Sequence, residues 1–171
     1  MTNKALFLDR DGVVNIDRGY VCRRGDFQFH DGFFELCRYF QYKNYKIIII
    51  TNQSGVARGY FTEDDLGELH KYMLGELARE NITITDIFYC VSIDDGHPDR
   101  KPNPGMFYKA REAHALDMAV SVSVGDKERD ILAAQKAGVG VNILFTQNVN
   151  AVTAAKYTVK NLREVLELCI S

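Results

Sequence analysis

Short apolar runs alternate along the chain with longer segments in which apolar residues recur every three or four positions. The short runs predict strands at 5–8, 46–50, 87–91, 120–124, 140–145 and 157–159. The helical spacing predicts helices at 31–43, 62–80, 104–114, 130–137 and 162–168. Asp31 is a suitable N-cap for the first helix, and Thr62 with Asp65 forms a weak capping box before the second.

This order of elements predicts the fold class. Strands separated by helices form βαβ units, so we expect an α/β fold of three layers, with a mainly parallel central sheet between helices. The four consecutive isoleucines at 47–50 are typical of a strand buried on both faces. No repeat, linker or low-complexity segment interrupts residues 1–171, so we expect a single domain.

Polar side chains follow four of the predicted strands. Ligands of parallel α/β sheets bind beyond the carboxyl ends of the strands, so we expect these side chains to converge on one place. The four clusters are Asp9 with Asp11, Thr51 with Asn52, Arg100 with Lys101 by way of a loop, and Asp126 with Lys127. Scattered surface polarity would not coincide with strand ends this often.

The first cluster is the most informative. Asp9 and Asp11 are two residues apart in an extended segment, so their side chains point the same way. Two carboxylates held that close repel unless a cation or a shared proton lies between them, and oxygen ligands of this kind suit Mg²⁺. Gly12 then lets the backbone turn away. An acidic, glycine-containing turn explains this stretch equally well when it is considered alone.

The four clusters together suit phosphoryl transfer, which needs a nucleophile, a metal and neutralised charge. Asp9 can attack phosphorus, and Asp11 can protonate the leaving alkoxide and then deprotonate water. Asp126 can hold Mg²⁺ with Asp9. The expected phosphate contacts are Thr51, Arg100, Lys101 and Lys127.

Charge and composition exclude several other classes of function. The formal net charge is −2, and no basic run is present, so neither nucleic acid nor a membrane surface is expected as a partner. No apolar stretch approaches the roughly 20 residues that span a bilayer, and we expect no signal peptide before the first strand. Cys22, Cys37, Cys90 and Cys169 are scattered, which favours a reduced, cytoplasmic chain. We expect a monomer.

The motifs also resemble those of a known family. The chain is similar to the haloacid dehalogenase superfamily, and more closely to its heptose-bisphosphate phosphatases, with histidinol-phosphate phosphatases as cousins. The resemblance covers about residues 4–145. It is carried by DRDGVVN at 9–15, GYV at 19–21, TNQSGVARG at 51–59, RKPNPGM at 100–106 and VGDK at 124–127.

The resemblance implies a Rossmann-like fold without a large cap domain, a Mg²⁺ cofactor and an aspartyl-phosphate intermediate. It implies removal of the 7-phosphate of D-glycero-D-manno-heptose 1,7-bisphosphate in nucleotide-heptose synthesis. Asp9 would be the nucleophile and a metal ligand, Asp11 the acid/base and a ligand through its carbonyl, and Asp126 a ligand. Catalytic phosphate contacts would be Thr51, Arg100 and Lys101. The substrate site would comprise Asp17, Arg18, Gly19, Tyr20, Thr51, Asn52, Gln53, Ser54, Arg100, Lys101 and Lys127. Another small phosphomonoester, or silent phosphate binding on the same fold, stays an alternative.

The chain departs from this family in one loop. Many members carry a zinc loop with a Cys-x-His pair and a later Cys-x-Cys pair, whereas residues 90–100 retain only Cys90, with His97 further along. Structural zinc takes four ligands, so we expect no zinc. This change leaves substrate and anomer preference open.

Several residues keep two interpretations. Arg58 suits either a phosphate contact or a loop salt bridge, and Asp130 suits either the metal's surroundings or the first turn of a helix. The polar and aromatic segment 15–30 is either a flap over the site or an ordinary surface loop. The residues expected to be structural or solvated are His30, His70, His114, Arg23, Arg24 and Asp26. His97 is expected near the site, and of its two interpretations a contact with substrate is the less favoured.

Overall fold

A six-stranded sheet forms the centre of the molecule, which the computed structural model describes for residues 2–168. The strand order is β3-β2-β1-β4-β5-β6, and every neighbouring pair is parallel. The strands are β1 (Lys4–Leu8), β2 (Tyr45–Asn52), β3 (Asp86–Cys90), β4 (Val122–Gly125), β5 (Val141–Phe145) and β6 (Tyr157–Val159). The predicted parallel sheet is therefore confirmed.

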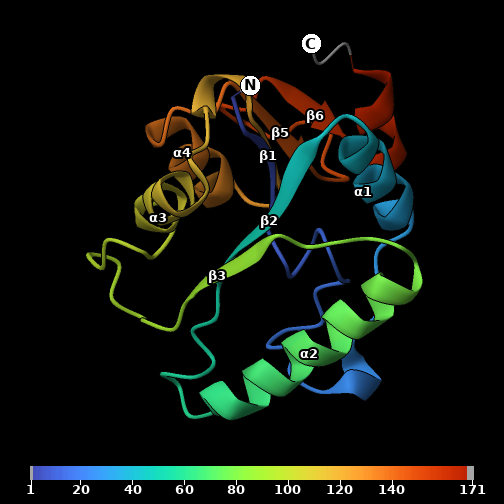
Figure 1. Ribbon diagram of the computed structural model, residues 1–171. Coiled ribbons are helices and arrows are strands. Elements are labelled where there is room, and N and C mark those ends of the chain that lie inside the picture. Colours follow the sequence, from blue (N-terminus) through green and yellow to red (C-terminus); the bar gives the residue numbers. More distant parts are fainter. Residues whose placement is uncertain (1, 169–171) are drawn as a thin grey trace.

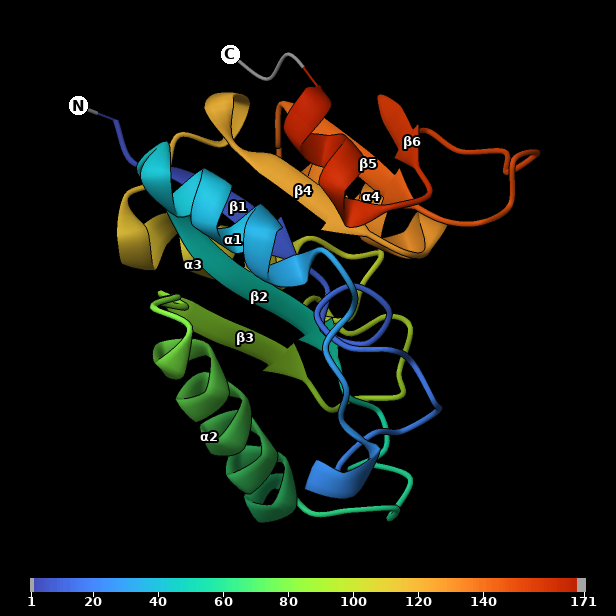
Figure 2. The same ribbon diagram turned by 90° about the vertical axis from the view of Figure 1, so that its right-hand side faces the viewer.

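Helices cover both faces of this sheet (Figures 1 and 2). The α-helices are α1 (Phe33–Tyr42), α2 (Glu63–Arg79), α3 (Gly105–His114) and α4 (Glu128–Lys136). Short 3-10 helices lie at η1 (Arg24–Asp26), η2 (Met118–Val120) and η3 (Leu162–Glu167). One apolar core holds residues of α1, α2 and η3, and a second core on the other face holds residues of α3 and α4.

Alternation within the central strands explains the two cores. In β2, Ile47 and Ile49 belong to the first core while Ile48 and Ile50 belong to the second. Successive side chains of a strand point to opposite faces, so a continuous apolar run buries both. All four isoleucines are at most 1% exposed, as the sequence predicts.

The connectivity locates the binding region. From β1 the chain crosses to β2 on one side, whereas β4 pairs with β1 on the other side. The strand order thus changes direction between β1 and β4. The connections that leave these two strands run to opposite sides, which opens a crevice beyond their carboxyl ends. The loops after β1, β2, β3 and β4 all meet there (Figure 2).

Two local predictions about helix ends differ from the structure. Asp31 is not the N-cap of α1, because Gly32 takes that position with a φ of 80° and the Asp31 carboxylate instead accepts from Arg163 at 2.7 and 2.9 Å. By contrast, the capping box of Thr62 and Asp65 is complete in both directions. The Oδ2 atom of Asp65 accepts from the Thr62 backbone N–H at 2.8 Å.

The segment expected as a final α-helix is also different. It is the 3-10 helix η3, in which only Leu162 and Val165 are buried. A 3-10 helix has three residues per turn, so residues three positions apart lie on the same side of it. This tighter helix can therefore bury both Leu162 and Val165 against the core. Cys169 lies outside the described residues. Within residues 2–168, no helix is long and apolar enough to cross a membrane.

Candidate active site

Three carboxylates meet at the carboxyl ends of β1 and β4. Asp9 follows β1, Asp126 follows β4, and Asp130 lies in the first turn of α4. One oxygen from each lies within 4.8 Å of the others, which is close enough to share one cation. The sequence predicts the pairing of Asp9 with Asp126. It left two interpretations for Asp130, and the structure agrees with both, because this residue lies in the first turn of α4 and also in the carboxylate cluster.

Two glycines allow this close approach. Gly12 has a φ of 98°, and a Cβ atom there would lie 2.2 Å from Oδ2 of Asp126. A Cβ atom on Gly125 would lie 2.3 Å from Cβ of Asp130. Any larger residue at either position would push a carboxylate out of the cluster, and at Gly12 it would also be strained by the left-handed backbone.

A buried lysine neutralises part of the cluster. Lys101 Nζ lies 2.9 Å from Oδ1 of Asp9 and 2.8 Å from Oδ1 of Asp130, and it donates to the Ile50 carbonyl at 2.8 Å. Burial alone would lower the pKa of Lys101, but the charges of Asp130 and Asp9 outweigh it and raise that pKa. Asn52 holds the lysine backbone from both sides, accepting at 3.0 Å and donating at 3.1 Å.

One lysine does not balance three carboxylates, of which Asp9 and Asp130 are buried and Asp126 is half-buried. Burial, followed by the charges of Asp9 and Asp130, raises the pKa of Asp126 to about 9. Burial also raises the pKa of Asp9, against the attraction of Lys101. Burial opposes ionisation of Asp130 too, yet its contacts with Lys101 lower its pKa. Oδ1 of Asp126 is buried and has no hydrogen-bond partner among residues 2–168. An oxygen-only donor set with excess negative charge fits Mg²⁺.

Asp11 is held separately from this cluster. Its Oδ1 accepts from Arg10 at 2.8 Å and from Asn15 at 3.0 Å, and its Oδ2 accepts from Gln53 at 2.8 Å. Gln53 also donates to the buried hydroxyl of Thr51 at 3.0 Å. The Asp11 side chain is thus fixed through both oxygens, and it stays partly exposed to the cavity beside Asp9.

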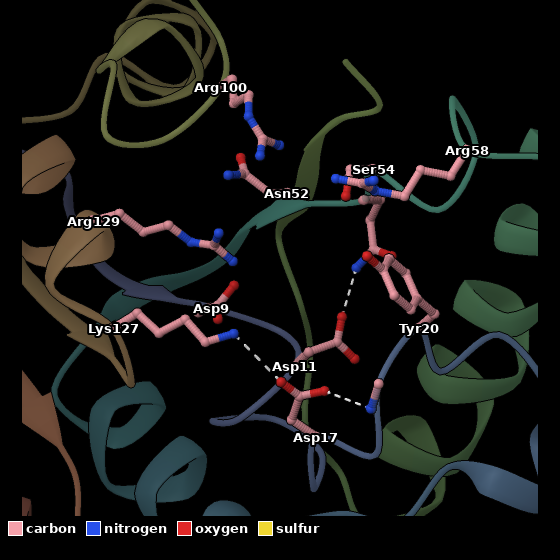
Figure 3. Close-up of a pocket in the computed structure, with 12 residues that line it drawn as sticks. Asp9, Asp11, Asp17, Tyr20, Asn52, Ser54, Arg58, Arg100, Lys127 and Arg129 are labelled. Atoms are coloured by element: carbon pink, nitrogen blue, oxygen red, sulfur yellow. Dashed lines mark hydrogen bonds and ion pairs between the residues drawn. The ribbon is translucent and has the colours of Figure 1, made fainter. Parts of the chain in front are cut away.

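A polar cavity of about 310 Å³ opens in front of these groups (Figure 3). The expected site residues that line it are Asp9, Asp11, Asp17, Gly19, Tyr20, Asn52, Gln53, Ser54, Arg100 and Lys127. Lys127 and Asp17 face each other at 3.4 Å. Three residues of the segment 15–30 line the cavity, so this segment forms one of its walls.

Three expected residues lie elsewhere. Thr51 and Lys101 are buried behind the cavity, in contact with Gln53 and Asp9 respectively. Arg18 points away from it and donates to the side chain of Gln28 at 2.7 Å. The backbone turns at Gly19, which has a φ of 77°, so Arg18 before the turn lies outside the cavity while Tyr20 after it lines the cavity.

Two arginines were not predicted as site residues. Arg129 lines the cavity and reaches toward Asp9 in Figure 3. It lies in the first turn of α4, three positions after Asp126, and this closeness to a predicted site residue is a signal that could have identified it. Arg10, which separates the two motif aspartates in the sequence, is fully buried. Strand alternation predicts that its side chain points away from both aspartates, yet its guanidinium contacts Asp11, and no sequence signal marks this contact. Arg58 also lines the cavity and has no salt bridge within the described chain.

His30, His97 and His114 contact other parts of the fold and do not line the cavity. His30 packs edge-on against Phe145, and His114 pairs with Asp86 at 2.8 Å. His97 lies 3.7 Å from Sγ of Cys90 and does not line the cavity. Among residues 2–168, the group of Asp9, Asp126 and Asp130 is the only set of three or more side chains placed to hold a metal.

Comparison with known proteins agrees with the geometry. The fold and the acidic site define a haloacid dehalogenase-like hydrolase, and the family model of that description matches residues 74–144. The chain is 46% identical to a D-glycero-alpha-D-manno-heptose-1,7-bisphosphate 7-phosphatase of Campylobacter jejuni, over 97% of this chain and 95% of the relative. It therefore belongs to the family of D-glycero-D-manno-heptose-1,7-bisphosphate 7-phosphatases.

Two further relatives extend this result. A D-glycero-beta-D-manno-heptose-1,7-bisphosphate 7-phosphatase of Helicobacter pylori is 41% identical, with 97% of each chain covered. The crystal structure of the D,D-heptose 1,7-bisphosphate phosphatase of B. bronchiseptica, complexed with magnesium and phosphate, superposes with a TM-score of 0.86 at 31% identity and covers 96% of both chains. The relatives are thus named for both anomers.

Proposed function

We propose that this protein hydrolyses the 7-phosphate of D-glycero-D-manno-heptose 1,7-bisphosphate in nucleotide-heptose synthesis. The observation that carries the proposal is the cluster of Asp9, Asp126 and Asp130 with the buried Lys101, which borders a polar cavity lined by several cations. The names of relatives at 41–46% identity over nearly the whole chain support the same substrate.

The reaction proceeds in two steps on the chain's own residues. A carboxylate oxygen of Asp9 forms a bond to phosphorus while the bond from phosphorus to the sugar oxygen breaks, and Asp11 gives its proton to that oxygen. Asp11 then takes a proton from water, whose oxygen displaces phosphate from Asp9. Lys101 holds Asp9 in place through the 2.9 Å contact and offsets negative charge during both steps.

Asp9, Asp126 and the backbone carbonyl of Asp11 would hold Mg²⁺, with Asp130 beside them. A bound Mg²⁺ neutralises the charge that develops on the phosphoryl oxygens. Binding it would also replace the proton that the raised pKa of Asp126 retains on this carboxyl group. Cys90 and His97 are two ligands where structural zinc takes four, so our proposal includes no zinc site.

The cavity walls would bind the rest of the substrate. Asp17, Gly19, Tyr20 and Ser54 line it and offer polar contacts to sugar hydroxyls. Its cationic residues would bind phosphate oxygens, and they are Arg58, Arg100, Lys127 and Arg129. We further propose a cytoplasmic monomer that acts on a small phosphorylated sugar and binds neither nucleic acid nor membrane.

The decisive experiment is phosphate release by wild type and by Asp9→Asn. We expect the variant to fold normally and to lose turnover entirely, because an amide cannot form the acyl phosphate. Asp86→Asn, which removes a carboxylate remote from the cavity, is the matched control and should retain activity. A panel containing both heptose bisphosphate anomers, histidinol phosphate and other sugar phosphates identifies the substrate. Normal turnover by Asp9→Asn would disprove the nucleophile, and no turnover of any phosphomonoester by wild type with Mg²⁺ would support silent phosphate binding.

A further inference from the structure

Arg10 is a buried cation outside the metal-binding cluster. It is 0% exposed, and its guanidinium contacts three parts of the chain. NH2 donates to both oxygens of Asp11 at 2.8 and 3.1 Å and to the Val21 carbonyl at 2.5 Å, and NH1 lies 3.3 Å from Nε2 of His70. A guanidinium removed from water is stable only when such partners surround it, so each of them also fixes its position.

His70 connects this arginine to a distant helix. It lies on α2, 60 positions from Arg10 in the sequence, and is 7% exposed. Burial and then the neighbouring positive charge of Arg10 lower the pKa of His70 to about 4, so its ring is neutral at physiological pH. Because NH1 of Arg10 can only donate, we assign the ring proton to Nδ1 and the acceptor role to Nε2.

Asp11 is the group that this chain of contacts orients. Asn15 and Gln53 each hold one of its oxygens, whereas Arg10 contacts both and so sets the plane of the carboxyl group. In the reaction proposed above, Asp11 must direct a proton at the leaving sugar oxygen. Proton transfer requires that geometry, and a displacement of about 1 Å in such a group costs about 10²-fold in rate.

We propose that His70 and Arg10 are positioning residues, through which helix α2 sets the direction in which Asp11 presents its carboxyl group to the leaving-group oxygen. This inference depends on the proposed phosphatase reaction. It assigns a role to a helix that contributes none of the residues lining the cavity.

If this inference is correct, the effect of misplacing Asp11 depends on the leaving group of the substrate. A sugar alkoxide is a poor leaving group and needs the proton from Asp11, whereas the phenolate of p-nitrophenyl phosphate leaves without it. The ratio kcat/KM reports only the steps up to formation of the phosphorylated Asp9, so hydrolysis of that intermediate does not obscure the comparison. Misdirecting Asp11 must therefore lower kcat/KM far more for sugar phosphates than for aryl phosphates.

A matched pair of substitutions at one position tests this. Glutamine places a polar atom where His70 has Nε2, and asparagine is too short to do so. We expect His70→Asn to lower kcat/KM for the heptose bisphosphate by about 10²-fold and for p-nitrophenyl phosphate by less than about threefold, with a steeper dependence on leaving-group pKa across a series of phosphate esters. His70→Gln should recover most of the loss. The control is His114→Asn, a histidine on another helix, which should leave the ratio between substrates unchanged.

Arg10→Lys gives a second, independent measurement if either histidine variant folds poorly. It keeps the charge but replaces the planar guanidinium, whose two nitrogens contact Asp11 and His70, with a single ammonium nitrogen. The connection from His70 to Asp11 is then lost, so the same selective loss is expected. In addition, His70→Asn should have no further effect in an Asp11→Asn background, because the group it positions is then absent. Equal losses for all leaving groups, or an unchanged effect in that background, would overturn the inference while leaving the phosphatase intact. A wild type without phosphatase activity would overturn both.

Discussion

Two clusters in this molecule each combine one cation with carboxyl groups, and burial makes the carboxyl groups of one cluster ionise differently from those of the other. Arg163 binds Asp31 and Glu35 on the surface, whereas Lys101 binds Asp9 and Asp130 inside the molecule. The two surface carboxyls are 80% and 45% exposed, and those beside Lys101 are 9% and 7% exposed.

The contrast appears in the pKa values. On the surface, hydrogen bonds from Arg163 lower the pKa of Asp31 and of Glu35, because water already solvates both charges. Inside, burial raises the pKa of Asp9 although Lys101 is adjacent, and it also raises the pKa of the neighbouring Asp126. Only Asp130 keeps a lowered pKa, because its contacts with Lys101 outweigh its burial. Burial therefore turns an ordinary acid–base cluster into one that is incomplete without a further cation.

The largest predicted effect comes from removing the cation of the buried cluster, and removing the cation of the surface cluster should change stability and turnover far less. We expect Lys101→Met to lower the free energy of unfolding by about 3–5 kcal/mol, because it leaves buried carboxylates unpaired. Turnover should fall by about 10²–10³-fold, since a group that offsets charge on Asp9 is lost.

The matched control is Arg163→Met, which should leave turnover unchanged and the free energy of unfolding nearly so. Urea unfolding and phosphate release measure the two quantities. Equal destabilisation by the two substitutions would mean that burial does not distinguish the clusters.

Arg58, a cavity cation without a salt bridge among residues 2–168, should matter to substrate binding and not to folding. Arg58→Gln should lower kcat/KM for the heptose bisphosphate by about 10–100-fold, which is the contribution of one charged hydrogen bond of about 1.5–3 kcal/mol. Activity on p-nitrophenyl phosphate, which has one phosphate, should change much less. Arg18→Gln is the control, because Arg18 lies outside the cavity and donates to Gln28. A larger loss from Arg18→Gln than from Arg58→Gln would place the substrate differently.

The smallest predicted effect is a difference in how pH acts on stability. The raised pKa of Asp126, about 9, means that the metal-free folded protein retains a proton that the unfolded chain releases near pH 4. This contribution to stability is present below pH 4 and is lost as pH rises toward 9. Asp31 and Glu35 have lowered pKa values, so their contribution is present above the unfolded values and is lost as pH falls below them.

Thermal unfolding in EDTA and in saturating Mg²⁺ tests the sign. In EDTA we expect Tm to fall by about 4 °C or more between pH 6 and pH 9, which corresponds to about 1–2 kcal/mol for a chain of this size. Mg²⁺ should abolish most of this fall, and so should Asp126→Asn in EDTA. Identical pH profiles with and without Mg²⁺ would contradict a metal site at Asp126.

The predictions that succeeded rest on repeating or local patterns. The isoleucines at 47–50 and the periodic segment that became α2 were recognisable because burial on a strand or helix follows directly from spacing. The capping box of Thr62 and Asp65 is likewise a contact between residues three apart. The expected cap at Asp31 failed because Arg163, which is 132 positions away, binds that carboxylate.

The site shows the same difference between what local patterns predict and what contacts between distant residues decide. Sequence patterns were sufficient to predict a parallel α/β sheet and the residues that end its strands, because strand ends converge whatever the side chains between them do. The order of the residues left two interpretations open for Asp130, and it could not indicate that Arg18 turns outward or that Arg10 and His70 meet. Those outcomes depend on which distant groups compete for each charge once water is excluded, and folding alone brings such groups within reach of one another.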